Sequence, residues 1–185
     1  ARAERAPDIW SAPEAGLHLQ HWFRVRGLAE LALYEDDPAA VARAAHDIRP
    51  FAGPAFAHVE AVRTETLYLV ARAAVVAGDA GAARKAIAPL VRVRAPYIRT
   101  FVRLVLAAIE VMRDRPDRAR ALLRGAASDA EAVDMPGTAA LARRRLAELD
   151  GDAAALAEAD AALAARGVTD PVAFARMFAT WPRTR

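Results

Sequence analysis

Apolar side chains recur at spacings of three and four residues along much of the chain, as they do in a helix that buries one face. The richest stripe lies between residues 56 and 76. It consists of Phe56, Val59, Val62, Thr66, Leu69, Val70, Ala73 and Val76. A comparable stripe lies between residues 98 and 112, and a shorter apolar-periodic run follows each of the two. The pattern therefore predicts amphipathic helices in which long and short members alternate.

Four turn signals divide these helices into pairs. They are Asp37-Pro38, Gly78-Asp79, Arg115-Pro116 and Gly151-Asp152. Aspartate caps a helix by accepting hydrogen bonds from its free backbone amides, and proline suits the first helical position. The intervals between Asp37, Asp79, Arg115 and Asp152 are 42, 36 and 37 residues. This spacing is typical of stacked helix pairs.

Together the stripes and the turn signals predict an all-α fold, an α-solenoid of about four antiparallel helix pairs that forms a single domain over residues 1–185. The pairs are expected at about 14–50, 55–93, 96–128 and 135–166. Within them, Pro89 is expected to kink its helix, and Gly125 is expected to fray or end the helix that contains it. The first helix is expected to begin near Glu14.

A last helix, at about 170–181, is predicted to cap the stack. Asp170 is a good cap and Pro171 a good first residue for it. Its large apolar side chains are Val172, Phe174, Phe178 and Trp181. Because a solenoid exposes an apolar face at its end, we expect this helix to pack on the last pair. At the opposite end, residues 1–12 are expected to belong to a preceding helix.

The composition agrees with this helical fold. Hydrophobic residues make up 55% of the 185 residues and aromatic residues only 6%, and alanine dominates. Alanine favours close helix packing, whereas sheets are richer in β-branched and aromatic residues. The absence of cysteine excludes disulfides and thiolate metal sites, and it fits a reducing, cytoplasmic location.

The charge balance gives no sign of a nucleic-acid partner. The chain carries 26 Lys and Arg against 23 Asp and Glu, a net charge of +3. The triplet Arg143-Arg144-Arg145 does not change this, because three consecutive helical residues spread over about 300° around the axis and form no single patch. Leu141, Ala142 and Leu146 are expected to set the buried side of this helix.

No apolar run approaches the roughly 18 uninterrupted residues of a membrane span, since arginines and a glutamate interrupt the richest runs. A membrane partner is therefore not expected. The sequence begins with Ala-Arg-Ala-Glu-Arg, without an initiating methionine or the apolar core of a signal peptide. We interpret the chain as a fragment of a longer protein.

Residues of catalytic chemistry form no recognisable set. The sequence has no Gly-x-Ser-x-Gly, glycine-rich phosphate loop or His-Glu-x-x-His motif. His18 and His21 lie three residues apart on one helical face, a spacing that can bring two imidazoles to a metal, but no cysteine or carboxylate at the next turn completes the set. We therefore expect no enzymatic activity, no cofactor and no metal, and a structural or surface role for these histidines.

Three runs of sequence resemble a known family. They are Leu17 to Tyr34 with the following Asp-Pro, Val59 to Ala73, and Gly167 to Met177. They are similar to the C-terminal repeats of large bacterial multidomain serine/threonine kinases of the myxobacterial type. In that group a kinase domain and a signal-transduction ATPase domain precede tetratricopeptide-like repeats. The resemblance covers about residues 15–180, and it implies a tetratricopeptide-like fold, a role in signal transduction, and catalytic domains that lie outside this chain.

A candidate binding surface follows from the repeat itself. Offsets of 42 and 36 residues place His21, Arg63 and Arg99 in one column of the three long helices. The first helices of successive pairs commonly line the concave surface of a solenoid, so this column is predicted to bind an acidic partner segment. The alternative is that Arg63 and Arg99 pack their stems on apolar neighbours and pair with carboxylates such as Glu60 in solvent.

These observations favour a protein–protein interaction or regulatory module of a larger bacterial signalling protein, not catalytic by itself. Its partner is expected to be a protein or peptide, or other domains of the parent chain. Two alternatives remain open: a sensor of small ligands or peptides that uses the concave groove, and a purely structural module that self-associates through its end helices. The oligomeric state does not follow from the sequence.

Overall fold

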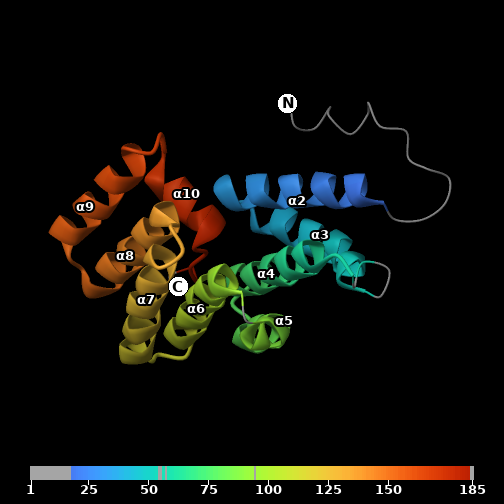
Figure 1. The fold of residues 1–185 in the computed structure, drawn as a ribbon, viewed down its shortest axis with the longest axis horizontal. Helices are drawn as coiled ribbons and strands as arrows, with labels where there is room; N and C mark the ends of the chain where they lie inside the picture. The colour runs from blue at the N-terminus through green and yellow to red at the C-terminus, as the bar shows by residue number, and fades with distance from the viewer. Residues whose placement is uncertain (1–17, 54–55, 57, 94, 184–185) are drawn as a thin grey trace.

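The computed structural model describes residues 18–53, 56, 58–93 and 95–183, and these residues contain helices and turns but no β-strand. Each helix except the last packs mainly on its neighbours in the chain, so these helices stack in sequence order (Figure 1). The predicted all-α solenoid is confirmed. The expected helix start at Glu14 and the expected helix within residues 1–12 lie outside the described residues.

Four helix pairs and a final helix make up the described stack. The pairs are α2 (Leu19–Tyr34) with α3 (Pro38–Ile48), α4 (Glu60–Val76) with α5 (Ala80–Ile87), α6 (Pro96–Met112) with α7 (Pro116–Glu131), and α8 (Pro136–Asp150) with α9 (Ala153–Ala164). Two short 3-10 helices, η2 (Arg49–Ala52) and η4 (Ala88–Arg92), follow α3 and α5, and α10 (Pro171–Phe178) is the last helix.

One turn geometry ends six of the described helices. In each turn a backbone N–H donates to the carbonyl oxygen five residues earlier, at 2.8–3.3 Å, which is the Schellman arrangement. The donors are Asp37, Asp79, Arg115, Met135, Asp152 and Val168. The residue before each donor has a positive φ, and it is always aspartate or glycine, the types that adopt this conformation most readily.

The helix caps predicted from the sequence are present where the residue is an aspartate. Asp37, Asp79, Asp152 and Asp170 each accept hydrogen bonds from backbone amides in the first turn of the next helix. Arg115 makes no such bond, so proline alone marks the start of α7. The short-range signals of the sequence thus set the helix starts.

The prediction that Gly125 ends its helix is wrong. α7 continues through Gly125 to Glu131. A Cβ at Gly125 would lie 2.2 Å from Nη1 of Arg103, so the glycine makes room for an arginine from α6. That arginine lies 3.1 Å from Oδ2 of Asp129, one turn further along α7. The glycine therefore serves the packing of α6 on α7.

Pro89 does not kink a continuous α-helix. Instead, α5 ends at Ile87 and the chain continues as the 3-10 helix η4, with Pro89 in its first turn. The first turn is where a missing backbone N–H costs least. Leu90 in η4 is buried, so the tighter turn extends the apolar face of α5.

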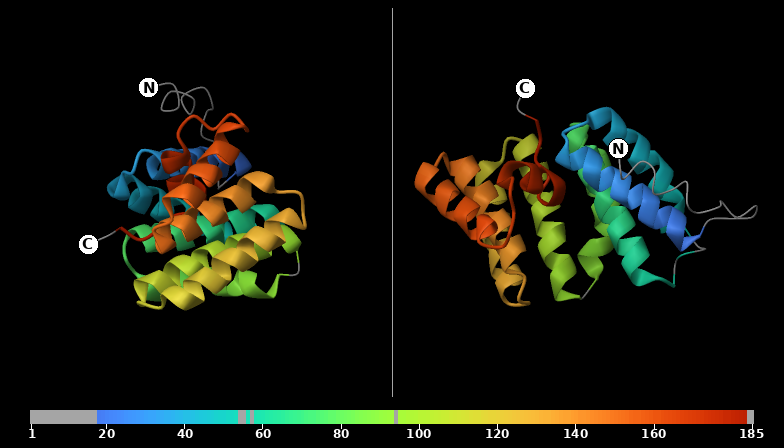
Figure 2. Two further views of the ribbon diagram at one scale, coloured as in Figure 1. Left: turned by 90° about the vertical axis from the view of Figure 1, so that its left-hand side faces the viewer. Right: turned by 90° about the horizontal axis from the view of Figure 1, so that it is seen from above.

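The position predicted for the terminal helix needs correction. α10 does not simply cover α9; it lies between the first and the last helix pairs and contacts α2 as well as α8 and α9 (Figures 1 and 2). The described residues form an N-terminal apolar cluster that includes Trp22 and Leu69, a middle one that includes Ile87 and Ile98, and a C-terminal one that includes Leu123 and Leu163. Phe174 and Phe178 of α10 pack on the C-terminal cluster, whereas Met177 packs on the N-terminal cluster. Trp181, just beyond α10, contacts both the C-terminal and the middle cluster. Residues 171–183, called the C-terminal segment below, therefore connect all three clusters.

Candidate functional site

Side chains of the stack hold three successive backbone carbonyls at the end of α10. Arg72 donates to the carbonyl oxygen of Met177, and the hydroxyl of Tyr68 donates to that of Phe178. From α8, Nε of Arg145 donates to the carbonyl oxygen of Ala179 at 2.7 Å. The last carbonyls of a helix have no partner within the helix and carry its negative dipole end, so cationic donors are well suited to them. We call Glu30, Tyr68, Arg72 and Arg145 the inner-face residues.

Arg72 is the best-compensated charge of the inner face. It is 2% exposed, and its Nη1 and Nη2 donate to the two carboxylate oxygens of Glu30 at 2.9 and 2.7 Å. Burial by itself lowers the pKa of Arg72, but the charge and hydrogen bonds of Glu30 outweigh it, and the pKa is raised above its ordinary value. The bidentate pair joins α4 to α2 and aims Arg72 at the end of α10.

Burial also perturbs Tyr68, which lies one turn before Arg72 on α4. It raises the pKa of Tyr68 to about 12, and the nearby charge of Arg72 opposes this shift. The phenol therefore stays protonated at neutral pH and donates to the segment. The guanidinium carbon of Arg72 lies 4.5 Å from the centre of the Tyr68 ring, so the two side chains also stack.

Arg145 is compensated less well than Arg72. It shares Glu148 with Arg144, and its Nη1 lies 2.6 Å from Oε2 of that glutamate. Burial is the main cause that lowers the pKa of Arg145, and the neighbouring cations Arg144 and Arg176 lower it further, although Glu148 raises it. Arg144 has a second carboxylate partner in Asp160, whereas Arg145 has only the shared Glu148.

The C-terminal segment also bonds back to the first helix pair. Nη2 of Arg176 donates to the carbonyl oxygen of Tyr34 at 2.9 Å, and Nη2 of Arg183 lies 2.9 Å from Oδ2 of Asp36. Both acceptors lie at the end of α2 or in the turn after it. The segment is therefore bonded to the first, second and last helix pairs at once.

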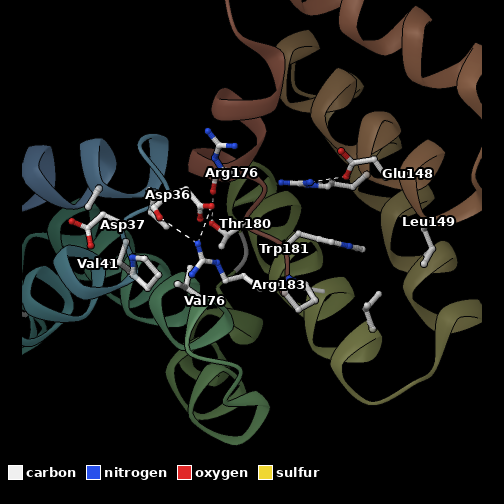
Figure 3. Close-up of a pocket in the computed structure, with 16 residues that line it drawn as sticks. Asp36, Asp37, Val41, Val76, Glu148, Leu149, Arg176, Thr180, Trp181 and Arg183 are labelled. Carbon is white, nitrogen blue, oxygen red and sulfur yellow. Dashed lines mark hydrogen bonds and ion pairs between the residues drawn. The ribbon is translucent and has the colours of Figure 1, made fainter. Parts of the chain in front are cut away.

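A cavity of about 510 Å³ lies beside the C-terminal segment (Figure 3). One wall is formed by Asp36, Asp37 and Val41 of the first pair, and Thr180, Trp181 and Arg183 of the segment form another. The remaining residues are Ala32, Leu33, Pro38, Val76, Val111, Arg145, Glu148, Leu149, Arg176 and Pro182. The lining thus combines apolar side chains with six charged ones, three carboxylates and three arginines.

His21, Arg63 and Arg99, which are predicted to form one binding column, have separate contacts in the structure. Nδ1 of His21 accepts from the backbone N–H of His18 at the start of α2. Arg99 forms an ion pair with Asp129 on α7, at 2.9 Å. This agrees with the alternative given in the sequence analysis, in which Arg99 pairs with a carboxylate and does not bind a partner. Arg63 is half-buried on α4. No hydrogen bond or ion pair of the described residues joins any two of the three, and none of them lines the 510 Å³ cavity.

The arginine triplet of α8 is placed differently from the sequence expectation. Leu141 and Ala142 are buried as predicted, but Leu146 is only half-buried, whereas Arg144 and Arg145 are 3% and 6% exposed. Both charges are buried because α8 packs between α7, α9 and the C-terminal segment, and because Glu148 and Asp160 lie close to them. The inner-face arginines are therefore the functional candidates that sequence reasoning missed.

One sequence signal could have indicated Arg72. It lies in the run from Leu67 to Ala77, where apolar residues surround it on every side of the helix. A helix that is apolar all round is buried, and a charge within it must find a partner. No comparable signal marks Arg145, because its triplet looks like an exposed charge run.

The described part of the chain contains no cluster suited to bind a metal ion and no helix suited to cross a membrane. No three or more His, Asp or Glu side chains gather there in a way that could hold a metal ion. None of the helices in these ranges combines the length and the apolar character needed to cross a membrane. Of the inner-face residues, Tyr68, Arg72 and Arg145 donate hydrogen bonds to backbone carbonyls of the C-terminal segment.

No protein-family model matches the chain, and neither a curated protein nor a solved structure does.

Proposed function

We propose that the chain is a protein–protein interaction module of a larger bacterial signalling protein, not catalytic by itself, which holds a helical segment against its inner-face residues. The observation that carries the proposal is the set of three successive carbonyls bound by Arg72, Tyr68 and Arg145. Donors that bind main-chain carbonyls recognise the end of a helix without reading its sequence. The apolar clusters beside them supply the selectivity.

In this proposal the C-terminal segment occupies the site in the resting protein. The partner is a helix that carries aromatic side chains near its C-terminal end, as α10 does with Phe174 and Phe178. Displacement of α10 would free the first and last helix pairs from each other, which offers a route from partner binding to the other domains of the parent chain. The proposal also includes a cytoplasmic location and the association with a kinase that the family resemblance implies.

The test is exchange of the segment in the folded protein. A protease site placed in the linker 165–170 allows the chain to fold intact and to be cut afterwards. A fluorescent peptide of residues 168–183 is then added, and anisotropy reports its binding. We expect saturable uptake by the cut protein, little uptake by the uncut protein, and weaker uptake by cut Arg145→Gln protein, because one carbonyl loses its donor.

The matched control is the same peptide with Phe174 and Phe178 replaced by serine, which keeps the backbone and loses the apolar anchors. Equal binding of this control peptide, or no exchange after cutting, would contradict the proposal. A second candidate site for a small ligand, built on His21, Arg63 and Arg99, is not supported by the contacts described above.

A further inference from the structure

Two arginines beside the 510 Å³ cavity have buried N–H groups without an acceptor. Nη2 of Arg145 and Nε of Arg176 are closed off from solvent and have no hydrogen-bond partner in the described part of the chain. Both residues line the cavity, one from α8 and the other from α10. A buried donor left without an acceptor is costly, and more so when it carries charge.

The carboxylates that line the cavity are already engaged. Asp36 pairs with Arg183, and Asp37 accepts from the amide of Ala40 as the cap of α3. Glu148 uses one oxygen for Arg144 and the other for Arg145. The described residues thus give Arg176 no carboxylate partner and Arg145 only a shared one. The two cations are also near enough for Arg176 to lower the pKa of Arg145.

The other orphaned arginine of the inner face does not form a comparable site. Nε of Arg72 is also buried without an acceptor, and its cavity measures about 90 Å³. That cavity is lined by the carboxylates of Glu30 and Glu65 as well as by Arg26. This space is too small for most ligands.

From these contacts we propose that the 510 Å³ cavity binds an oxyanion, a carboxylate or phosphate group carried by a small apolar body, between Arg145 and Arg176. Guanidinium groups bind both oxyanions through charge-assisted hydrogen bonds. The apolar body is required by the remaining walls, which include Leu33, Val76 and Trp181. A volume of this size lies within the range of small-molecule sites.

The site is distinct from the partner surface proposed above, although the two share Arg145. Nε of Arg145 donates to the carbonyl oxygen of Ala179, whereas Nη2 has no acceptor and is the donor proposed to bind the ligand. Because Arg176 belongs to α10, an anion that bridges it to Arg145 ties α10 to α8. The ligand would therefore stabilise the form in which the C-terminal segment is in place.

The test uses the full chain and two probes with the same aromatic body, phenyl phosphate and hydrocinnamate. Hydrocinnamyl alcohol is the uncharged control probe. Isothermal titration calorimetry at matched ionic strength is expected to show saturable binding of at least one anion, and the same anion should raise the melting temperature. Binding of the phosphate alone assigns a phosphorylated ligand, and binding of the carboxylate alone assigns an organic acid; either supports the site.

Three variants show where the anion binds. Arg176→Gln is expected to weaken binding by about tenfold to a hundredfold, because a charged hydrogen bond is lost. Arg176→Lys keeps the charge without the planar donors, and it is expected to fall between wild type and Arg176→Gln. Arg124→Gln removes an exposed arginine of α7 outside the cavity, and its affinity should equal that of the wild type.

The proposal is overturned if neither anion binds saturably up to about 10 mM, a concentration at which even weak ligands stabilise the folded state measurably. It is also overturned if the alcohol binds as tightly as both anions, or if Arg176→Gln and Arg124→Gln bind alike. None of these results depends on whether the cut segment exchanges, so the partner proposal stands or falls separately.

Discussion

The residues that decide this structure are arginines with buried guanidinium groups. Arg72, Arg144 and Arg145 are all buried, although a charged side chain in a helical repeat normally extends into solvent. Each is held by a carboxylate, and Arg72 and Arg145 also donate to carbonyls of the C-terminal segment. Burial of Arg72 and Arg145 is thus coupled to the position of α10.

The first prediction compares one buried and one exposed ion pair. Arg72→Met leaves Glu30 half-buried without its bidentate partner, so we expect a loss of about 3–5 kcal/mol in the free energy of unfolding. Arg26→Met breaks the pair between Arg26 and Glu65, whose side chains are 36% and 41% exposed, and should cost no more than about 1 kcal/mol. Urea titration followed by circular dichroism measures both.

The double variant Glu30→Leu/Arg72→Met provides the control for charge. It removes the stranded carboxylate, so it should recover part of the loss caused by Arg72→Met alone. Equal stability of Arg72→Met and Arg26→Met would show that the buried pair does not support the fold as described.

Among the elements, those fixed by local signals could be predicted from the sequence. Apolar stripes and aspartate caps placed the four pairs, because periodicity and capping act within one or two helical turns. Gly125 was misread because its neighbour Arg103 is distant in sequence. The buried arginines and the position of α10 could not be derived either, since both depend on contacts such as that between Arg176 and Tyr34, 142 residues apart.

The second prediction, at the scale of the element, concerns the turn geometry. Gly78 has a φ of 72° in the turn between α4 and α5, and a Cβ there would meet nothing within 4 Å. Gly78→Ala should therefore lower stability by about 1–2 kcal/mol through backbone strain alone. Gly137→Ala, in the first turn of α8 where the space is also open, should be neutral or stabilising by up to about 1 kcal/mol.

Thermal unfolding of the two glycine variants measures this difference. A Gly78→Ala protein as stable as Gly137→Ala would mean that the turn after α4 does not adopt the left-handed conformation. The same reasoning would then fail for the equivalent turn at Gly151, whose φ is 67°.

At the scale of the whole molecule, the C-terminal segment connects the two ends of the described stack. A solenoid gains stability mainly from contacts between neighbouring repeats, so its ends are normally independent of each other. Here residues of α10 and the residues that follow it bond to the first pair, to α4 and to α8. We therefore expect the first and last pairs to respond together when the segment is released.

The most direct test of this account is chemical cross-linking between the C-terminal segment and the first pair. The sequence has no cysteine, so Glu35→Cys/Arg183→Cys carries one pair of thiols, which lies where Arg183 contacts Asp36 in the wild type and replaces that contact. A short bismaleimide should cross-link this pair within one chain in high yield, and it should leave Lys85→Cys/Arg183→Cys largely unlinked, because α5 lies beyond α4 and α6 from α10 (Figure 1). No cross-link at 35/183, or equal yields in the two variants, would contradict the claim that the segment bridges the ends of the stack.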